Sequence, residues 1–173
     1  FWMSRNVISQ EIFSLLSLEE HVCRTIGSKK PVDSMNREVA LQFCNELSKH
    51  WGLEVLYVLR KKRNQRRSGI GIALPSLEQW RYACYRGNTS IGWHCDNAQR
   101  SSQDISSSYP NQFQIYDLLG NVWEWLEDGV EKQDGLVAGG SWRSYESDVE
   151  HNPIKKMAKD GADDVGFRIV ISK

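Results

Sequence analysis

The sequence predicts an α+β domain in which two amphipathic helices are set among short strands and long loops. Three observations support this fold class. Apolar residues recur every four positions between residues 35 and 51, as on a helix with one buried face. Short segments near both ends of the chain alternate between apolar and polar residues, which is typical of strands. Residues 88–114 are polar and rich in serine, which indicates a long loop.

The first fifty residues predict a strand, a short helix and a long helix. Phe1–Ser9 alternates imperfectly and is the expected strand, and Gln10–Leu18 is the expected short helix. Ser34 is the expected N-cap of the long helix, which ends at Gly52. The buried face of this helix is expected to carry Val39, Phe43, Leu47 and Trp51, with Ala40 and Cys44 beside them.

A hairpin is expected after the long helix. Leu53–Leu59 is a strong strand candidate, and the alternating Ile70, Ile72 and Leu74 indicate a second strand. The basic run between the two segments is expected at a solvated hairpin tip.

The second helix has a clear start signal. Ser76 and Gln79 have the S-x-x-Q spacing of a capping box, which predicts a helix from this point to about Tyr85. Trp80 and Cys84 fall on one face of this helix, and Gly87 ends it. Two strands are expected near the C-terminus, at Leu136–Ala138 and Gly166–Ile171.

The composition favours one domain without a nucleic-acid or membrane partner. The 173 residues suffice for one domain with a sizeable core, residues 1–173, and the first residue, Phe1, suggests a fragment of a longer chain. Lys plus Arg and Asp plus Glu each number 22, so no net field attracts nucleic acid. No apolar run reaches the ~20 residues of a membrane helix. The cysteines form no C-x-x-C, so we expect free buried thiols and a cytoplasmic location.

Three sequence blocks together resemble the formylglycine-generating enzymes, also called sulfatase-modifying factors. They are the helix segment from Pro31 to Asn45, the segment L-P-S-L-E-Q-W-R-Y-A from Leu74, and Y-D-L-L-G-N-V-W-E-W from Tyr116 followed by G-G-S-W and G-F-R. The resemblance implies a C-type-lectin-like fold with two main helices, a small twisted antiparallel sheet and long loops. The tryptophans of these motifs are expected to be buried scaffold residues.

The chain departs from this family where the enzymes bind copper. The resemblance implies two copper-binding cysteines shortly after G-G-S-W, and the matching residues here are Ser144 and Val149. Because Cu(I) selects thiolate ligands, we expect no copper and no oxidase activity. The four histidines are scattered and are expected to be ordinary polar side chains.

A structural calcium site is the one cofactor that the resemblance supports. The ligands implied are the carboxylates of Asp117 and Glu124 and the backbone carbonyls of Gly120 and Val122. A set made only of oxygen atoms suits Ca²⁺. The alternative is that Asp117 caps a turn and that Glu124 makes a buried hydrogen bond or salt bridge.

The leading functional hypothesis is a non-catalytic ligand- or protein-binding module, as found in this family fused to bacterial Ser/Thr kinases. Its expected binding residues include Arg143, Ser144 and Tyr145, directly after G-G-S-W. An alternative is the hypervariable binding protein of a diversity-generating retroelement, although Asn152 is the only asparagine in Arg143–Val165. The other alternative is an active copper-dependent oxidase.

A basic cluster is a second candidate binding surface. Six of the eight residues from 60 to 67 are basic: Arg60, Lys61, Lys62, Arg63, Arg66 and Arg67. They either protect a strand edge from aggregation or form a docking surface for an acidic partner, a phosphorylated segment or a membrane headgroup. Asp160, Asp163 and Asp164 are the candidates for an internal counter-charge.

Overall fold

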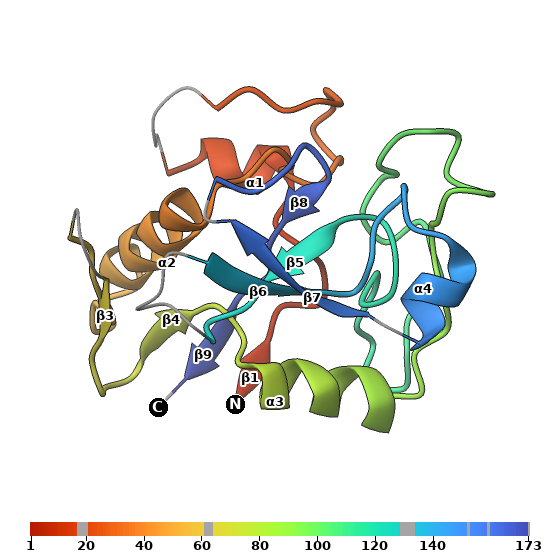
Figure 1. The fold of residues 1–173 in the computed structure, drawn as a ribbon. Coiled ribbons are helices and arrows are strands. Elements are labelled where there is room, and N and C mark those ends of the chain that lie inside the picture. Colours follow the sequence, from red (N-terminus) through yellow and green to blue (C-terminus); the bar gives the residue numbers. More distant parts are fainter. Residues whose placement is uncertain (17–20, 61–63, 129–133, 152, 159, 173) are drawn as a thin grey trace.

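The computed structural model describes residues 1–16, 21–60, 64–128, 134–151, 153–158 and 160–172. Its central sheet has the strand order β7-β6-β5-β8 (Figure 1). These strands are β5 (Trp123–Trp125), β6 (Asp134–Ala138), β7 (Ile154–Ala158) and β8 (Val165–Gly166). The pairs β5–β6 and β6–β7 are antiparallel, whereas β5 and β8 run parallel. A purely antiparallel sheet was expected, so this sheet differs from the expectation in one pair. Glu124 lies at its centre, paired with both Ala138 and Gly166.

A second sheet joins the two ends of the chain. Its order is β1-β9-β4, with β1 at Trp2–Met3, β4 at Gly71–Ala73 and β9 at Val170–Ser172. The termini consequently lie close together in Figure 1, since Trp2 pairs with Ile171. The strand expected over Phe1–Ser9 is much shorter, although Ile8 still donates a backbone hydrogen bond to Phe167 O at 2.9 Å.

The long helix, α2, is confirmed at Arg37–His50, but its cap is not the expected one. Asn36 is the N-cap, and its side chain accepts a hydrogen bond from Val39 N at 2.9 Å. Ser34 has a φ of 55° and lies in the turn before the helix. Trp51 was expected on the buried face, yet it is 55% exposed because the helix ends one residue before it.

Helix α2 holds the hairpin through one buried side chain. The amide of Asn45 donates to Tyr57 O at 2.8 Å and accepts from Tyr57 N at 3.0 Å. Tyr57 belongs to β2 (Tyr57–Val58), which pairs antiparallel with β3 (Gln65–Arg66). A hairpin is therefore present, but its second strand lies within the basic run that was expected to be the tip. The segment with Ile70, Ile72 and Leu74, which was expected to be the second strand, instead forms β4 and pairs with β9.

The other helices are short. Helix α1 covers Gln10–Ser14, and α3 (Leu77–Arg81) starts at the predicted capping box of Ser76 and Gln79. The chain then continues as the π-helix η1 (Tyr82–Arg86) up to Gly87. Helix α4 (Glu146–His151) was not expected, because its only buried residue is Val149 and the segment has no apolar periodicity.

The core is anchored by tryptophans, as the motifs predicted. Trp80, Trp123, Trp125 and Trp142 are each at most 5% exposed. Trp125 Nε1 donates to Met35 O at 2.8 Å, which ties the central sheet to the segment before α2. No helix in the described ranges is long and apolar enough to cross a membrane.

Candidate ligand-binding site

A buried ion pair connects residues of two of the sequence motifs. Glu124 and Arg168 have fully buried side chains, and Arg168 Nη2 and Nε lie 2.6 and 2.7 Å from the two Glu124 oxygens. Trp80 Nε1 also donates to Glu124 Oε2, at 3.2 Å. Arg168 donates further to Tyr116 O and Ser4 O. Burial raises the pKa of Glu124, and the Arg168 guanidinium opposes that shift. This pair is structural, because protein donors meet every charge.

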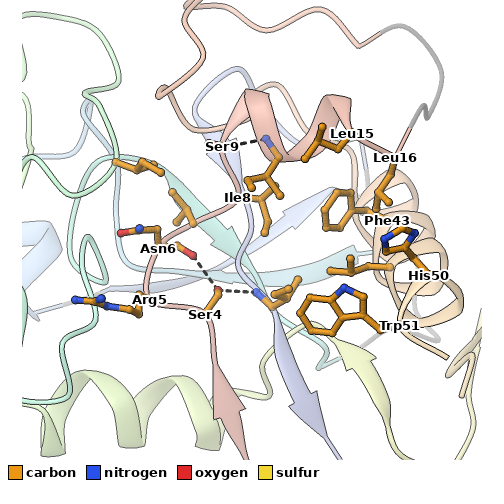
Figure 2. A pocket seen from close by; sticks show the side chains of 15 residues that line it. Ser4, Arg5, Asn6, Ile8, Ser9, Leu15, Leu16, Phe43, His50 and Trp51 are labelled. Carbon is orange, nitrogen blue, oxygen red and sulfur yellow. Dashed lines mark hydrogen bonds between the residues drawn. The ribbon is translucent and has the colours of Figure 1, made fainter. Parts of the chain in front are cut away.

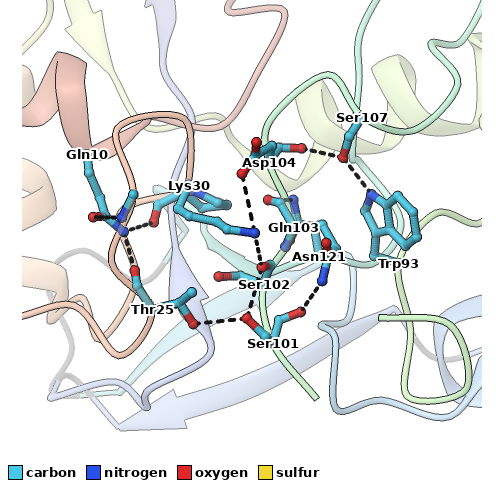
Figure 3. A network of polar contacts seen from close by, with 12 residues as sticks. Gln10, Thr25, Lys30, Trp93, Ser101, Ser102, Gln103, Asp104, Ser107 and Asn121 are labelled. Carbon is cyan, nitrogen blue, oxygen red and sulfur yellow. Dashed lines mark hydrogen bonds and ion pairs between the residues drawn. The ribbon is translucent and has the colours of Figure 1, made fainter. Parts of the chain in front are cut away.

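The polar loop of residues 93–108 is held in place by side chains from several segments (Figure 3). Asn121 accepts from Gln103 N at 2.9 Å and donates to Gln103 O at 3.2 Å. Lys30 donates to Ser102 O at 2.8 Å and lies 3.3 Å from an Asp104 carboxylate oxygen. These bonds fix the middle of the loop, which forms a wall, and Ala98 of the loop belongs to the same buried cluster as Trp142.

The wall borders a surface on which two arginines cover one tryptophan. The guanidinium carbon atoms of Arg143 and Arg24 lie 4.5 and 5.2 Å from the Trp142 ring centroid. Both arginines also contact the same Asp163 oxygen, each at 2.6 Å. Tyr145, two positions after Arg143, is 67% exposed. We name these five residues the Trp142 face. Trp142 is buried beneath the two arginines, so this face offers cations that can bind carboxylates, held in place by the tryptophan ring.

Ser144 and Val149 both lie beside Gly140. A Cβ atom built on Gly140 would lie 2.6 Å from Val149 Cγ2 and 3.5 Å from Ser144 Oγ, so both side chains border the same glycine. Ser144 Oγ accepts a hydrogen bond from Ser141 N at 3.0 Å, and Val149 is fully buried. The two positions that the resemblance aligned with copper-binding cysteines are therefore adjacent in space, and neither carries a thiol.

The comparison with family models decides the family. The model of the sulfatase-modifying factor enzyme 1-like domain matches residues 17–173. The chain belongs to this family. Three solved structures share the fold, namely variable protein 1 of Treponema denticola, CarF, and PvdO of Pseudomonas aeruginosa. Their TM-scores are 0.81, 0.81 and 0.74, their identities are 19%, 18% and 15%, and they cover 99%, 99% and 96% of this chain. The matches cover 84%, 85% and 78% of those chains.

Curated relatives of this sulfatase-modifying-factor domain include two kinases and a chaperone. Serine/threonine-protein kinase pkn1 of Chlamydia caviae is 29% identical over 110 residues, and that of Chlamydia pneumoniae is 25% identical over 108 residues. These alignments cover 47% and 46% of this chain but only 18% and 17% of the kinases. Chaperone protein LppX of Paenibacillus barcinonensis is 23% identical over 200 residues, which covers 85% of this chain and 71% of that protein.

The calcium ligands expected for this domain are already engaged by protein donors. Asp117 is buried, and its two carboxylate oxygens accept from Ser108 Oγ at 2.5 Å and from Ser106 N at 3.3 Å. Burial raises the pKa of Asp117, which hydrogen bonding and Arg168 partly offset. Glu124 is likewise bound to Arg168. The Asp117 and Glu124 carboxylates could therefore bind a calcium ion only if Ser106, Ser108 and Arg168 moved away from them. Calcium at this site stays a prediction.

The basic cluster of the domain is only partly outward-facing. Lys61, Lys62 and Arg63 lie outside the described residues. Arg66 Nε lies 2.5 Å from Glu127 Oε1, which also accepts from the Tyr57 hydroxyl at 2.9 Å. Arg60 and Arg67 are exposed.

Two of the three expected counter-charges of the basic cluster, Asp163 and Asp164, contact other residues of the described ranges instead. Asp163 pairs with Arg24 and Arg143, and Asp164 accepts from Ser141 Oγ at 2.6 Å. Glu127, which was not considered, supplies the internal partner of Arg66. It lies 61 positions further along the chain, so no local pattern pointed to it.

A largely apolar cavity of about 760 Å³ forms a second concave feature (Figure 2). Its wall includes Leu15 and Leu16 after α1, and His50 and Trp51 at the end of α2. Ser4 and Arg5 contribute polar atoms from the opposite wall. None of the binding residues expected after G-G-S-W lines this cavity.

Proposed function

We propose that this chain is a non-catalytic binding module of a signalling protein and that it binds its partner at the Trp142 face. The observation that carries the proposal is that Ser144 and Val149 meet beside Gly140. A serine hydroxyl and a valine methyl cannot replace the thiolates that Cu(I) requires. The chain therefore lacks the ligands for the copper-dependent oxidation that the family resemblance implies. It keeps the Trp142 face, which can serve as a binding surface.

The chemistry of the Trp142 face favours an acidic partner. Arg24 and Arg143 share the single carboxylate of Asp163, which leaves guanidinium donors for a second carboxylate or phosphate. Exposed Tyr145 adds an apolar contact with a polar end. A carboxylate or phosphate bound by the two arginines, next to an apolar group on Tyr145, would satisfy both features.

The signalling context rests on the likeness to the pkn1 kinases. Because the chain spans under a fifth of each kinase, the kinase activity of those proteins is not transferred to it. We propose instead that the chain acts as the regulatory or partner-binding part of such a protein. The full reading frame is the check: a kinase domain in the same frame supports this context, and its absence contradicts it.

A gain-of-function experiment tests the loss of the copper site. In the double variant Ser144→Cys/Val149→Cys, two thiols border Gly140, and we expect Cu(I) binding measured by competition with a chromogenic chelator. The wild type and each single variant should bind at least tenfold more weakly. The wild type should also leave the mass of a C-x-P-x-R peptide unchanged with Cu(I) and oxygen. Peptide oxidation by the wild type, or no gain in the double variant, would contradict the proposal.

A separate experiment tests the Trp142 face. The probe is a fluorescent glutamate-rich peptide, whose binding is measured by anisotropy at low and high salt. We expect Arg143→Glu and Tyr145→Ala to weaken binding, and the matched Arg100→Glu, at an exposed arginine outside the face, to leave it unchanged. Equal losses in Arg143→Glu and Arg100→Glu, with no loss in Tyr145→Ala, would mean that only net charge matters and would contradict the proposal.

The hypervariable-protein alternative is favoured by one observation. Variable protein 1 of Treponema denticola shares the fold, and residues 143–148 of this chain are almost entirely exposed. Sequencing the same locus from many isolates tests this alternative. Variation concentrated in residues 143–165 would support it, and a uniform sequence would remove it.

A further inference from the structure

Three consecutive side chains that can bind a metal ion converge beside the Trp142 face. They are His94, Cys95 and Asp96, and one ligand atom from each lies within 4.8 Å of the other two. Within the described part of the chain, no other three His, Cys, Asp or Glu side chains meet this criterion. From the sequence, His94 was expected to be an ordinary polar side chain, because no H-x-x-x-H pattern surrounds it.

The backbone explains why neighbouring residues can share one point. His94 N donates to Asn97 Oδ1 at 2.7 Å, and His94 O accepts from Ala98 N at 2.9 Å. These bonds close residues 94–98 into one turn. Cys95 N also donates to Ser144 O at 3.0 Å, which fastens the turn to the segment before α4. The three side chains are therefore held on a fixed backbone, which lowers the entropy cost of binding an ion.

The buried imidazole of His94 supplies the second, independent observation. His94 is only 8% exposed, and its Nδ1 atom is buried without a hydrogen-bond partner among the described residues. Nδ1 lies 3.6 Å from Asp96 Oδ2, which is too far for a hydrogen bond. The Cys95 thiol contacts the other carboxylate oxygen of Asp96 at 3.5 Å. A buried nitrogen atom without a partner costs free energy, and a cation between these three groups would satisfy it.

We propose that His94, Cys95 and Asp96 bind one Zn²⁺ ion. Thiolate, imidazole and carboxylate are all established zinc ligands, and the mixture of sulfur, nitrogen and oxygen excludes the hard ions Ca²⁺ and Mg²⁺. Three protein ligands leave the fourth tetrahedral position for water or for a group of a bound partner. Asp96 has a side chain that is 73% exposed, so this position is reachable from solvent. The thiol loses its proton on binding.

This zinc site differs from the copper site that the family resemblance implies. It uses none of the residues at positions 144 and 149, and its sulfur comes from the loop wall rather than from the segment after G-G-S-W. It lies next to the Trp142 face through the bond from Cys95 to Ser144. It does not depend on the proposed function, since zinc can bind whether or not a partner docks there.

Metal titration tests the proposal. Zn²⁺ should bind with a stoichiometry of one per chain in competition with a chromogenic chelator, and Co²⁺ should give a thiolate charge-transfer band in the near ultraviolet. Cys95→Ser should abolish this band and weaken zinc binding at least tenfold. Asp96→Asn should also weaken zinc binding at least tenfold. Both side chains are on the surface turn, so the folds of these variants should persist, which circular dichroism checks.

The matched control is His151→Asn. His151 Nδ1 faces Glu150 Oε2 at 3.7 Å, which reproduces the imidazole–carboxylate spacing without a thiol. This variant should bind zinc and cobalt like the wild type. The proposal is overturned if the wild type binds no stoichiometric zinc, if Cys95→Ser keeps the cobalt band, or if His151→Asn loses it.

Thiol alkylation gives an independent readout. Cys23, Cys44 and Cys84 are buried, so the native protein should react quickly at Cys95 alone. Burial raises the pKa of Cys84 to about 12, which slows its reaction further. Zinc should slow the alkylation of Cys95 at least tenfold, whereas Mg²⁺ should not. Unchanged alkylation at saturating zinc would contradict the assignment of Cys95 as a ligand.

Discussion

At the scale of single residues, a few buried polar side chains hold together segments that are remote in sequence. Arg168 is the clearest case, since its guanidinium contacts Glu124, Tyr116 O and Ser4 O. The sequence motifs pointed to Glu124 and Arg168 as part of the family pattern. They did not reveal that the two residues pair, because the pairing depends on β5 and β8 lying side by side. The alternative offered for Glu124, a buried salt bridge, is the arrangement found.

Removing Arg168 should be strongly destabilising. Arg168→Met leaves the Glu124 carboxylate buried without its cation, which typically costs about 3–5 kcal/mol. The double variant Glu124→Gln/Arg168→Met removes both charges and should recover part of this loss. Urea denaturation of the wild type, the two single variants and the double variant measures the coupling. Additive effects in this cycle would show that the pair is not energetically linked.

At the scale of helices and strands, local signals were reliable where they rest on short-range chemistry. The Ser76 and Gln79 capping box and the buried face of α2 follow from neighbouring residues, and both are present, except that Trp51 is exposed and Val39 is only half-buried. Long-range contacts set only part of what was missed. The ion pair of Arg66 with Glu127 is such a contact. The N-cap was missed for a local reason, since Ser34 adopts a positive φ and Asn36 supplies the cap instead. The π-helical turn after α3 had no sequence signal.

The capping box gives a prediction for α3. Ser76→Ala removes the acceptor for Gln79 N, which lies 3.1 Å away, and should cost about 1 kcal/mol in the free energy of unfolding. Ser147→Ala, at an exposed serine in α4, is the control and should change stability by less than ~0.5 kcal/mol. Chemical denaturation measures both. Equal effects would mean that the cap contributes nothing specific.

The basic cluster gives a second prediction at this scale. Exposed Arg60 and Arg67 are the residues to reverse if the cluster docks an acidic partner, whereas Arg66 is held by Glu127. Arg60→Glu/Arg67→Glu should lose partners in a pull-down and should not change stability. Arg66→Ala should lower the melting temperature, because it leaves Glu127 without its cation. Unchanged partners and unchanged salt sensitivity would leave the cluster as protection of a strand edge.

At the scale of the whole molecule, the sheet that joins both ends should matter for stability. Deleting residues 1–4 removes β1, exposes one edge of β9 and takes away Ser4 O, an acceptor of Arg168. We therefore expect a lower midpoint of urea unfolding and faster hydrogen exchange at Val170 and Ile171. Substituting Trp2→Ala, at a side chain that is 79% exposed, is the milder control and should change the midpoint little.

The pairing of β1 with β9 also has a mechanical consequence. The two strands are antiparallel, and their outer residues, Trp2 and Ser172, lie at the same end of the pair. A force that pulls these two residues apart would therefore open the hydrogen bonds between the strands one after another rather than all at once. Tension would therefore peel this terminal pair first. Deeper in the molecule, the bonds from Arg168 to Ser4 and Glu124 would resist next. Pulling experiments on single molecules should show a weak early step before the main rupture.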